Sequence, residues 1–424
     1  MNTIEGGHYP SGVYTVVYKG KGEIAFTNAE VKSSVPGKLL VEMDAKRGGF
    51  FLQLRRTDPA DPVRDIRVYL PGHGPDSAPG GFNPSLLARW RGASTVRFMD
   101  WMATNGSKQE RWADRPKTTD ATWTVKGAPV ETMVDLANRL GADPWFTLPH
   151  RADDEYVRAF AKLVKERLDP KRKVYIEYSN EVWNTMFEQT RYVGQQGVRL
   201  KLAEKEWEAG WRYTAQRSVE IFDIWESVFG GRDRLVRVLP GFAANDWINN
   251  EILSWKDASK HADALAIAPY IPFNIGPDSK PPLAEVAGWS LDRLFQELQE
   301  EALPEAIGFM QKNAAVAKKH GLKLIAYEGG PHLVGVAGGE NDERMTALFL
   351  KANADPRMGS LLDGYFKGWA EAGGGEFAYF SSVSGWSKWG SWGALQYADD
   401  DPAKSPKWGA MRRFATSQGQ KFGG

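Results

Sequence analysis

Residues 174–184 read VYIEYSNEVWN, in which an aromatic and β-branched stretch leads into Ser-Asn-Glu at residues 179–181. Such residues favour a strand, and a strand places alternate side chains on one face. We therefore expect Glu177, Ser179 and Glu181 to share a face, with Glu181 at the C-terminal end and Glu177 below it. A buried glutamate needs a partner, which we expect to be Arg97 or a similar donor. A solvated surface position for Glu177 is the alternative.

Similar short apolar stretches recur along the chain and alternate with helical patterns. The candidate strands are Ile66–Leu70, Thr95–Trp101, Pro144–His150, Val174–Asn180, Leu235–Gly241, Ala264–Tyr270, Lys323–Glu328 and Glu376–Ser382. The candidate helices include Val130–Leu140, Glu155–Arg167, Gln216–Phe229 and Pro304–His320. Eight β/α units in one stretch predict an α/β fold of the closed (β/α)8 TIM-barrel type. An open sheet fits less well, because no strand precedes a glycine-rich phosphate-binding signature.

The N-terminal region has a different pattern. From residue 12 to about 60, alternating segments are separated by Gly, Asn, Ser and Pro without helical periodicity. We predict a small all-β module at residues 1–62 and the catalytic barrel at residues 63–424. The linker at residues 57–62 is short and contains proline, which favours a module that packs on the barrel over a separate polysaccharide-binding module.

The composition excludes several partners. The 424 residues include 54 Lys and Arg against 53 Asp and Glu, a net charge of +1, so nucleic acid and membrane surfaces are not expected partners. Cysteine is absent, which excludes disulfides and a cysteine nucleophile. The compartment is not decided by the sequence; we expect a secreted or periplasmic monomer whose signal peptide lies outside this sequence.

The seventeen tryptophans are either core residues or flat platforms on which sugar rings stack. Trp386 lies in a loop-like segment at residues 384–389, where a large aromatic side chain is hard to bury, so we favour a platform. Trp101 and Trp183 stay open between the two interpretations.

In a barrel, the catalytic residues lie at the C-terminal ends of the strands. These ends carry Pro71 and His73, Trp101, His150, Glu181, Gly241, Tyr270, Glu328 and Trp386. Two of them are glutamates, on the fourth and seventh strands, which face each other across the mouth of an eight-stranded barrel. Glycoside hydrolysis needs such a pair: about 5 Å apart for a retaining enzyme and about 6.5–9.5 Å for an inverting one.

Other chemistries have little support. The six histidines are scattered without a His-Glu-x-x-His motif, and no Gly-x-Ser-x-Gly elbow follows a strand. We therefore expect no metal, no cofactor and no serine nucleophile. The glycine-rich run at residues 335–339 predicts a flexible loop beside the active site.

The segments Tyr178–Asn184 and Ile325–Gly330 resemble those of the clan A glycoside hydrolases, which are retaining β-glycosidases, cellulases, mannanases and xylanases on (β/α)8 barrels. The resemblance spans about residues 64 to 400. It implies that Glu181 is the acid/base and Glu328 the nucleophile. It also implies that Asn180 binds the sugar 2-hydroxyl group.

The resemblance implies further roles around this pair. Arg97 would steady the nucleophile, His150 would lie near the acid/base, and Tyr270 would donate a hydrogen bond to Glu328. Trp386 would form the floor of the site for the attacked sugar. The clan often has a histidine two residues before the strand-six tyrosine, where this chain has Ala268, and this weakens the assignment of Tyr270.

Together these observations predict a retaining glycoside hydrolase that cleaves a β-linked poly- or oligosaccharide by double displacement. The abundance of tryptophan favours an endo-β-1,4-glucanase. A β-mannanase or a xylanase of the same clan is the first alternative, and a non-catalytic carbohydrate-binding protein is the alternative from another class.

Overall fold

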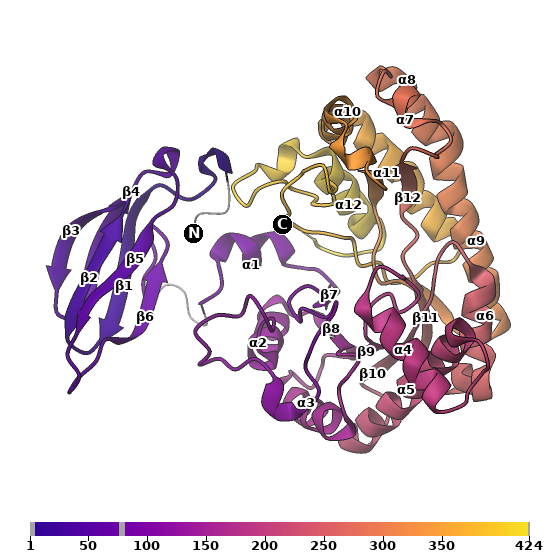
Figure 1. Cartoon of the computed structure of the whole chain (residues 1–424), viewed down its shortest axis with the longest axis horizontal. Coiled ribbons are helices and arrows are strands. Elements are labelled where there is room, and N and C mark those ends of the chain that lie inside the picture. Colours follow the sequence, from indigo (N-terminus) through magenta and orange to yellow (C-terminus); the bar gives the residue numbers. More distant parts are fainter. Residues whose placement is uncertain (1–4, 76–80, 423–424) are drawn as a thin grey trace. The chain divides into compact units, whose positions relative to one another are not determined.

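The computed structural model describes residues 5–75 and 81–422 of the chain. It divides into two compact units (Figure 1). The first comprises residues 1–87 with 397–401, and the second comprises residues 88–396 with 402–424. No helix among the described residues is long and apolar enough to cross a membrane.

The first unit is built from antiparallel strands. Their bounds are β1 Gly12–Lys19, β2 Gly22–Thr27, β3 Glu30–Val35, β4 Lys38–Met43, β5 Phe51–Thr57 and β6 Arg64–Tyr69. One sheet has the order β3-β4-β1-β6, and β2 pairs with β5 in a second. Alternate residues of β1 and β4 are buried, and Phe26 and Leu52 of the second sheet pack against them. The expected N-terminal all-β module is therefore present.

The prediction that Ile66–Leu70 forms the first barrel strand is wrong. Residues Arg64–Tyr69 pair antiparallel with β1 and complete the N-terminal sheet. Charged residues alternate with Ile66 and Val68 here, and nearly all of the strand is exposed. That pattern suits an antiparallel edge strand, whereas parallel barrel strands are buried on both faces. The division between the units accordingly lies at residue 87 rather than 62, and the packing of the module on the barrel stays a prediction.

The second unit contains one parallel sheet. Its strands are β7 Thr95–Arg97, β8 Asp143–Leu148, β9 Val174–Tyr178, β10 Leu235–Pro240, β11 Ala264–Ile267 and β13 Lys323–Ala326, in the order β7-β8-β9-β10-β11-β13. Strands two to seven of the predicted barrel are therefore found in sequence order. Their side chains form an apolar interior around Trp145, Val238 and Ile325.

The eighth predicted strand continues this sheet by a single parallel bridge between Ala326 and Phe377. The Ala326 amide donates to the Glu376 carbonyl at 2.9 Å. Within residues 5–75 and 81–422, no strand pairs with the other edge of β7. The fold is α/β and of the (β/α)8 TIM-barrel type. The segment that was predicted to form the first barrel strand does not occupy that position.

Helices follow the strands along the chain (Figure 1). They are α1 Pro84–Trp90, α2 Val130–Leu140, α3 Asp154–Arg167, α4 Glu188–Arg199, α5 Glu206–Phe229, α6 Asp246–Ser254, α7 Leu283–Val286, α8 Leu291–Glu297, α9 Leu303–Lys319, α10 Glu343–Ala354, α11 Pro356–Glu371 and α12 Pro406–Ser417. Helix α3 illustrates their origin: the Asp153 side chain accepts a hydrogen bond from the Tyr156 amide, and Val157, Phe160 and Val164 are buried on one face.

Two further strands lie beyond the C-terminal ends of β11 and β13. Strand β12 (Ile271–Ile275) begins directly after Tyr270, and β14 (Pro331–Gly335) begins three residues after Glu328. They pair in parallel, Ile271 opposite Pro331, and we call this pair of strands the ribbon. Because it leaves the barrel beside Tyr270 and Glu328, it stands on the same side of the barrel as those two residues.

Candidate active site

Arg97, on β7, connects the polar residues at the strand ends. Its guanidinium donates from Nε and Nη2 to the Glu177 carboxylate, both at 3.0 Å. It also donates from Nη1 to Glu328 Oε1 and from Nη2 to Asn180 Oδ1, both at 2.8 Å. The side chain is 5% exposed. The predicted contact between Glu177 and Arg97 is confirmed, and the predicted contact between Arg97 and Glu328 is present as well.

Glu328 follows β13 and is buried, with both carboxylate oxygens hydrogen-bonded. Oε1 accepts from Arg97, and Oε2 accepts from the Tyr270 hydroxyl at 2.9 Å. Burial raises the pKa of Glu328 above its ordinary value, while Arg97 and Tyr270 favour the ionised form. The negative charge of Asp100, just after β7, also raises this pKa. Glu328 is thus a carboxylate with two donors directed at it.

Glu181 lies in a different environment. The Asn184 amide donates to its Oε2 at 2.9 Å. Burial, followed by the negative charge of Glu328, raises the pKa of Glu181 to about 8. A carboxyl group with this pKa is protonated at neutral pH. The two carboxyl groups therefore lie close enough for the charge of Glu328 to raise the pKa of Glu181.

The backbone before Glu181 departs from the predicted strand. Strand β9 ends at Tyr178, and both Ser179 and Glu181 have left-handed backbone conformations, with φ of 59° and 42°. The alternation of residues 177, 179 and 181 on one extended strand is therefore wrong. Positive φ is uncommon for residues other than glycine and clusters at functional sites. The turn carries Glu181 away from the strand direction, at a position where the charge of Glu328 raises its pKa.

Glu177 is fully buried beneath this pair. The Trp145 indole donates to its Oε2 at 2.8 Å, in addition to the two bonds from Arg97. Burial raises the pKa of Glu177 to about 7, and Arg97 opposes the shift. The solvated alternative for Glu177 is wrong.

A group of amides that the sequence did not reveal holds Asn180. Its Nδ2 donates to Asn105 Oδ1 at 3.1 Å, and its carbonyl accepts from Gln189 Nε2 at 2.7 Å. Gln189 Nε2 also donates to Asn105 at 2.7 Å. Asn105 lies in the loop after β7 and Gln189 in α4. Within this group, one of the two N–H bonds of the Asn180 side-chain amide has no acceptor. A hydrogen bond to a sugar hydroxyl would require such an N–H.

Trp183 is tied to the site by its polar edge. Its Nε1 donates to the hydroxyl of Tyr327, the residue before Glu328, at 3.2 Å. One face of its ring stacks on Phe242 at 3.9 Å between centroids. The side chain is half-buried, so it is not enclosed in the barrel interior. Its role in binding stays a prediction.

The surroundings of Trp386 differ from those of the predicted open platform. Its Nε1 donates to the Gly393 carbonyl at 3.1 Å, and Lys407 Nζ lies 4.3 Å from its ring centroid. One face of this half-buried ring is therefore occupied by a buried lysine. The eighth predicted strand approaches Glu328 at Phe380, whose amide donates to the Gly329 carbonyl at 3.0 Å. Neither of these Trp386 contacts involves Glu181 or Glu328. The role of Trp386 as the floor of the sugar site stays a prediction.

Trp101 and His150 have contacts of their own. The half-buried Trp101 packs against Phe98, 5.7 Å between ring centroids. His150 is 1% exposed, and its Nε2 accepts from Arg151 at 3.4 Å. Burial, then the charge of Arg151, lowers the pKa of His150 to about 4. Its ring meets the edge of Tyr192 at 5.0 Å. Neither residue makes a hydrogen bond with Glu181 or Glu328.

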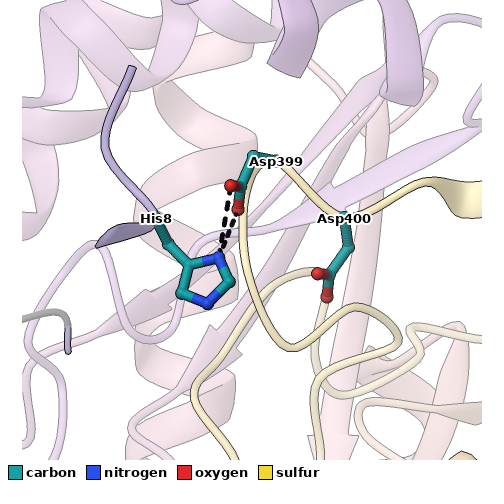
Figure 2. A group of neighbouring side chains, drawn as sticks. All are labelled: His8, Asp399 and Asp400. Atoms are coloured by element: carbon teal, nitrogen blue, oxygen red, sulfur yellow. Dashed lines mark hydrogen bonds and ion pairs between the residues drawn. The ribbon is translucent and has the colours of Figure 1, made fainter. Parts of the chain in front are cut away.

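One group of side chains in the first unit has the composition of a metal site. Figure 2 shows His8 with Asp399 and Asp400, whose ligand atoms all lie within 4.8 Å of one another. His8 Nδ1 contacts Asp399 Oδ1 at 2.9 Å, and its ring stacks on Tyr397 at 3.4 Å. This pairing and stacking account for the geometry of His8 without an ion. The expectation that the protein holds no metal or cofactor stays a prediction.

No family model and no curated protein matches the sequence. In structure, the chain is similar to a GH51 arabinofuranosidase from Xanthomonas axonopodis pv. citri, with 14% identity and a TM-score of 0.38, over 70% of this chain and 59% of that chain. It is similar to a 4-O-α-L-rhamnosyl-β-D-glucuronidase from Fusarium oxysporum 12S, with 12% identity and a TM-score of 0.47, over 80% of this chain and 65% of that chain. The chain spans less than two thirds of the length of these two proteins.

A third similar structure is a GH5-4 broad specificity endoglucanase from Bacteroides salanitronis, with 13% identity and a TM-score of 0.40, over 76% of this chain and 81% of that chain. Independently of these likenesses, the chain has a parallel barrel with glutamates after its fourth and seventh strands. In fold it resembles the clan A glycoside hydrolases.

Proposed function

We propose that the protein is a retaining glycoside hydrolase in which Glu328 is the nucleophile and Glu181 the acid/base. One observation carries the proposal: Glu328 and Glu181 are neighbouring carboxyl groups with different partners, a cation and a hydroxyl on Glu328 and a neutral amide on Glu181. Glu328 accepts hydrogen bonds from Arg97 and Tyr270, whereas the pKa of Glu181 is raised to about 8. Two carboxyl groups whose partners favour the ionised form of one and the protonated form of the other can divide the roles of nucleophile and acid.

The mechanism follows from these settings. Ionised Glu328 attacks the anomeric carbon while Glu181 gives its proton to the leaving glycosidic oxygen, which forms a glycosyl ester and releases the first sugar. The charge that raised the pKa of Glu181 is then gone, so this pKa falls and Glu181 accepts a proton from water. The resulting hydroxide attacks the ester, restores the Glu328 carboxylate and releases the second sugar with its original configuration.

The abundance of tryptophan supports a β-1,4-linked glucan as substrate and endo-action on it. β-Mannan and xylan are the alternatives, because the loops that read the substituents of the sugar ring distinguish them. A panel of the three polysaccharides with sizing of the products decides between them. Binding to a polysaccharide without release of reducing ends would instead favour the non-catalytic carbohydrate-binding protein.

The roles are tested by two substitutions. Glu328→Gln should abolish turnover, and azide should rescue Glu181→Ala with a β-glycosyl azide as product. Glu376→Gln is the matched control, because Glu376 bonds Ser94 at the opposite end of the barrel and should retain activity. An α-configured first product, observed by proton NMR, would reject Glu328 as the nucleophile.

A further inference from the structure

The two faces of the ribbon differ. Ile271, Phe273 and Ile275 of β12 are buried on one face, where the Phe273 ring lies 6.1 Å from Trp289 and 5.7 Å from Phe349. Asn274, on the other face of β12, is exposed. Asn274 contacts His332, and the His332 ring lies against Tyr270, so these three side chains lie on one side of the ribbon.

His332 of β14 links this open face to the nucleophile. Its ring lies 5.3 Å from the ring of Tyr270, whose hydroxyl is bonded to Glu328. On its other side the imidazole lies 5.7 Å from Trp392, and Trp392 lies 6.0 Å from Phe380. Tyr270, His332, Trp392 and Phe380 therefore form a continuous aromatic wall that begins at the nucleophile.

The hydrogen bonding of His332 leaves one nitrogen unused. Nδ1 lies 2.7 Å from Asn274 Oδ1, and an amide oxygen only accepts, so Nδ1 carries the proton. Burial lowers the pKa of His332 to about 4, so the imidazole is neutral at physiological pH and Nε2 keeps its lone pair. No described residue donates to Nε2. A hydroxyl group of a ligand is a suitable donor.

We propose that His332, Asn274 and Trp392 form a subsite for a neutral sugar unit next to the one that Glu328 attacks. The His332 Nε2 atom accepts a hydrogen bond from a sugar hydroxyl, and the Trp392 ring packs against the sugar. Asn274 fixes the imidazole in the required orientation and is a positioning residue. This inference rests on the proposed function and names the residues that select a neutral, hydroxyl-bearing sugar unit.

The position next to the attacked sugar follows from the order of the side chains. The Tyr270 hydroxyl contacts Glu328, and its ring separates His332 from that carboxylate. A sugar held at Glu328 therefore occupies the space in front of the tyrosine hydroxyl. The imidazole faces the unit beyond it.

A binding experiment tests the subsite without turnover. Cellotriose, mannotriose and xylotriose are titrated by calorimetry into the Glu328→Gln variant, alone and combined with His332→Phe, which keeps an aromatic ring but has no Nε2. One lost hydrogen bond to the ligand should weaken binding about tenfold. Asn274→Ala, at an exposed position, should give a smaller loss. His320→Phe is the matched control, because His320 also bonds an asparagine, Asn250, at 3.1 Å, and should leave affinity unchanged.

The outcomes separate the two proposals. If the wild-type chain binds a trisaccharide but cleaves none, the proposed hydrolase function fails while the tenfold effect of His332→Phe supports the subsite. If it cleaves and His332→Phe binds the trisaccharide as tightly as its parent, the subsite is wrong and the hydrolase function stands. If none of the three trisaccharides binds, both are wrong.

A kinetic comparison locates the subsite. On 4-nitrophenyl β-glucoside, which offers one sugar, His332→Phe should leave kcat/KM unchanged. On 4-nitrophenyl β-cellobioside, the same substitution should lower kcat/KM about tenfold, mainly through KM. Equal loss on both substrates would place His332 at the attacked sugar and overturn the assignment.

Discussion

Replacing Tyr270 with phenylalanine removes a single hydroxyl group from the site and retains the ring. That hydroxyl donates to Glu328 Oε2 at 2.9 Å; Glu328 is buried and Tyr270 is half-buried. A hydrogen bond to a charged group contributes about 1.5–3 kcal/mol, and loss of that amount lowers the rate about 10- to 100-fold. Because the lost donor favoured the ionised carboxylate, the pKa of Glu328 should rise further.

The direction of the pH effect follows from the role of Glu328. The nucleophile must be ionised, so the acid limb of kcat/KM against pH reports its pKa. A higher pKa moves this limb to higher pH, while the alkaline limb, set by Glu181, should move little. The measurement is a pH profile with an aryl β-cellobioside, supplemented by the pH dependence of covalent labelling of Glu328 with a 2-deoxy-2-fluoro glycoside.

Tyr365→Phe is the matched control. The Tyr365 hydroxyl is also buried and donates to the Pro269 carbonyl at 2.7 Å, next to Tyr270 but without contact to a carboxylate. Its loss should lower stability without moving either limb. An unchanged acid limb in Tyr270→Phe, together with full activity, would refute the claim that this hydroxyl supports the nucleophile.

Three further changes test other contacts. Asn184→Ala removes the donor to Glu181, whose pKa is about 8, so the alkaline limb should move to higher pH in the same profile. Arg97→Met leaves the buried Glu177 without its cation and should lower the free energy of unfolding by about 3–5 kcal/mol, measured by urea denaturation. Asp153→Ala removes the cap of α3 and should cost about 1 kcal/mol of stability with kcat/KM unchanged.

The sequence predicted the central contacts because they depend on strand order alone. Parallel strands bring their C-terminal ends to one side of the sheet, so Glu181 and Glu328 could be placed near each other from their positions after strands four and seven. The resemblance to clan A supplied the contacts of Arg97 and Tyr270 with Glu328, and both are present. These contacts join residues that lie up to 231 positions apart in the sequence.

The pairing of strands that lie far apart in the sequence could not be predicted from strand order. Ile66 and Val68 alternate with charged residues, which is compatible with a strand in either unit, and only the pairing with β1 decides the sheet. The ribbon was also missed, although Ile271, Phe273 and Ile275 alternate with a period of two. The glycine-rich run that predicted a flexible loop begins at Gly335, the last residue of β14.

Contacts between side chains of separate segments formed the third limit. Asn105, Gln189 and His332 lie in separate segments, and only the folded chain brings them to Asn180 or Tyr270. Trp386 illustrates the reverse case, since exposure of its segment suggested a platform while Lys407 covers one of its faces. A side chain on an irregular segment has no period from which its direction follows.

Glu177 and Arg97 form a buried ion pair that takes no direct part in the proposed reaction. Its role is to orient the groups that do. Two parallel hydrogen bonds from Arg97 to Glu177 fix the plane of the guanidinium. Once the plane is fixed, Nη1 can only point at Glu328 and the second proton of Nη2 at Asn180. Trp145 donates to the Glu177 Oε2 atom that also accepts from Arg97 Nε, so residues of the barrel interior help to set the direction of the bond to Glu328. A lysine at position 97 could supply the charge but not this geometry, because its ammonium group lacks the planar fork.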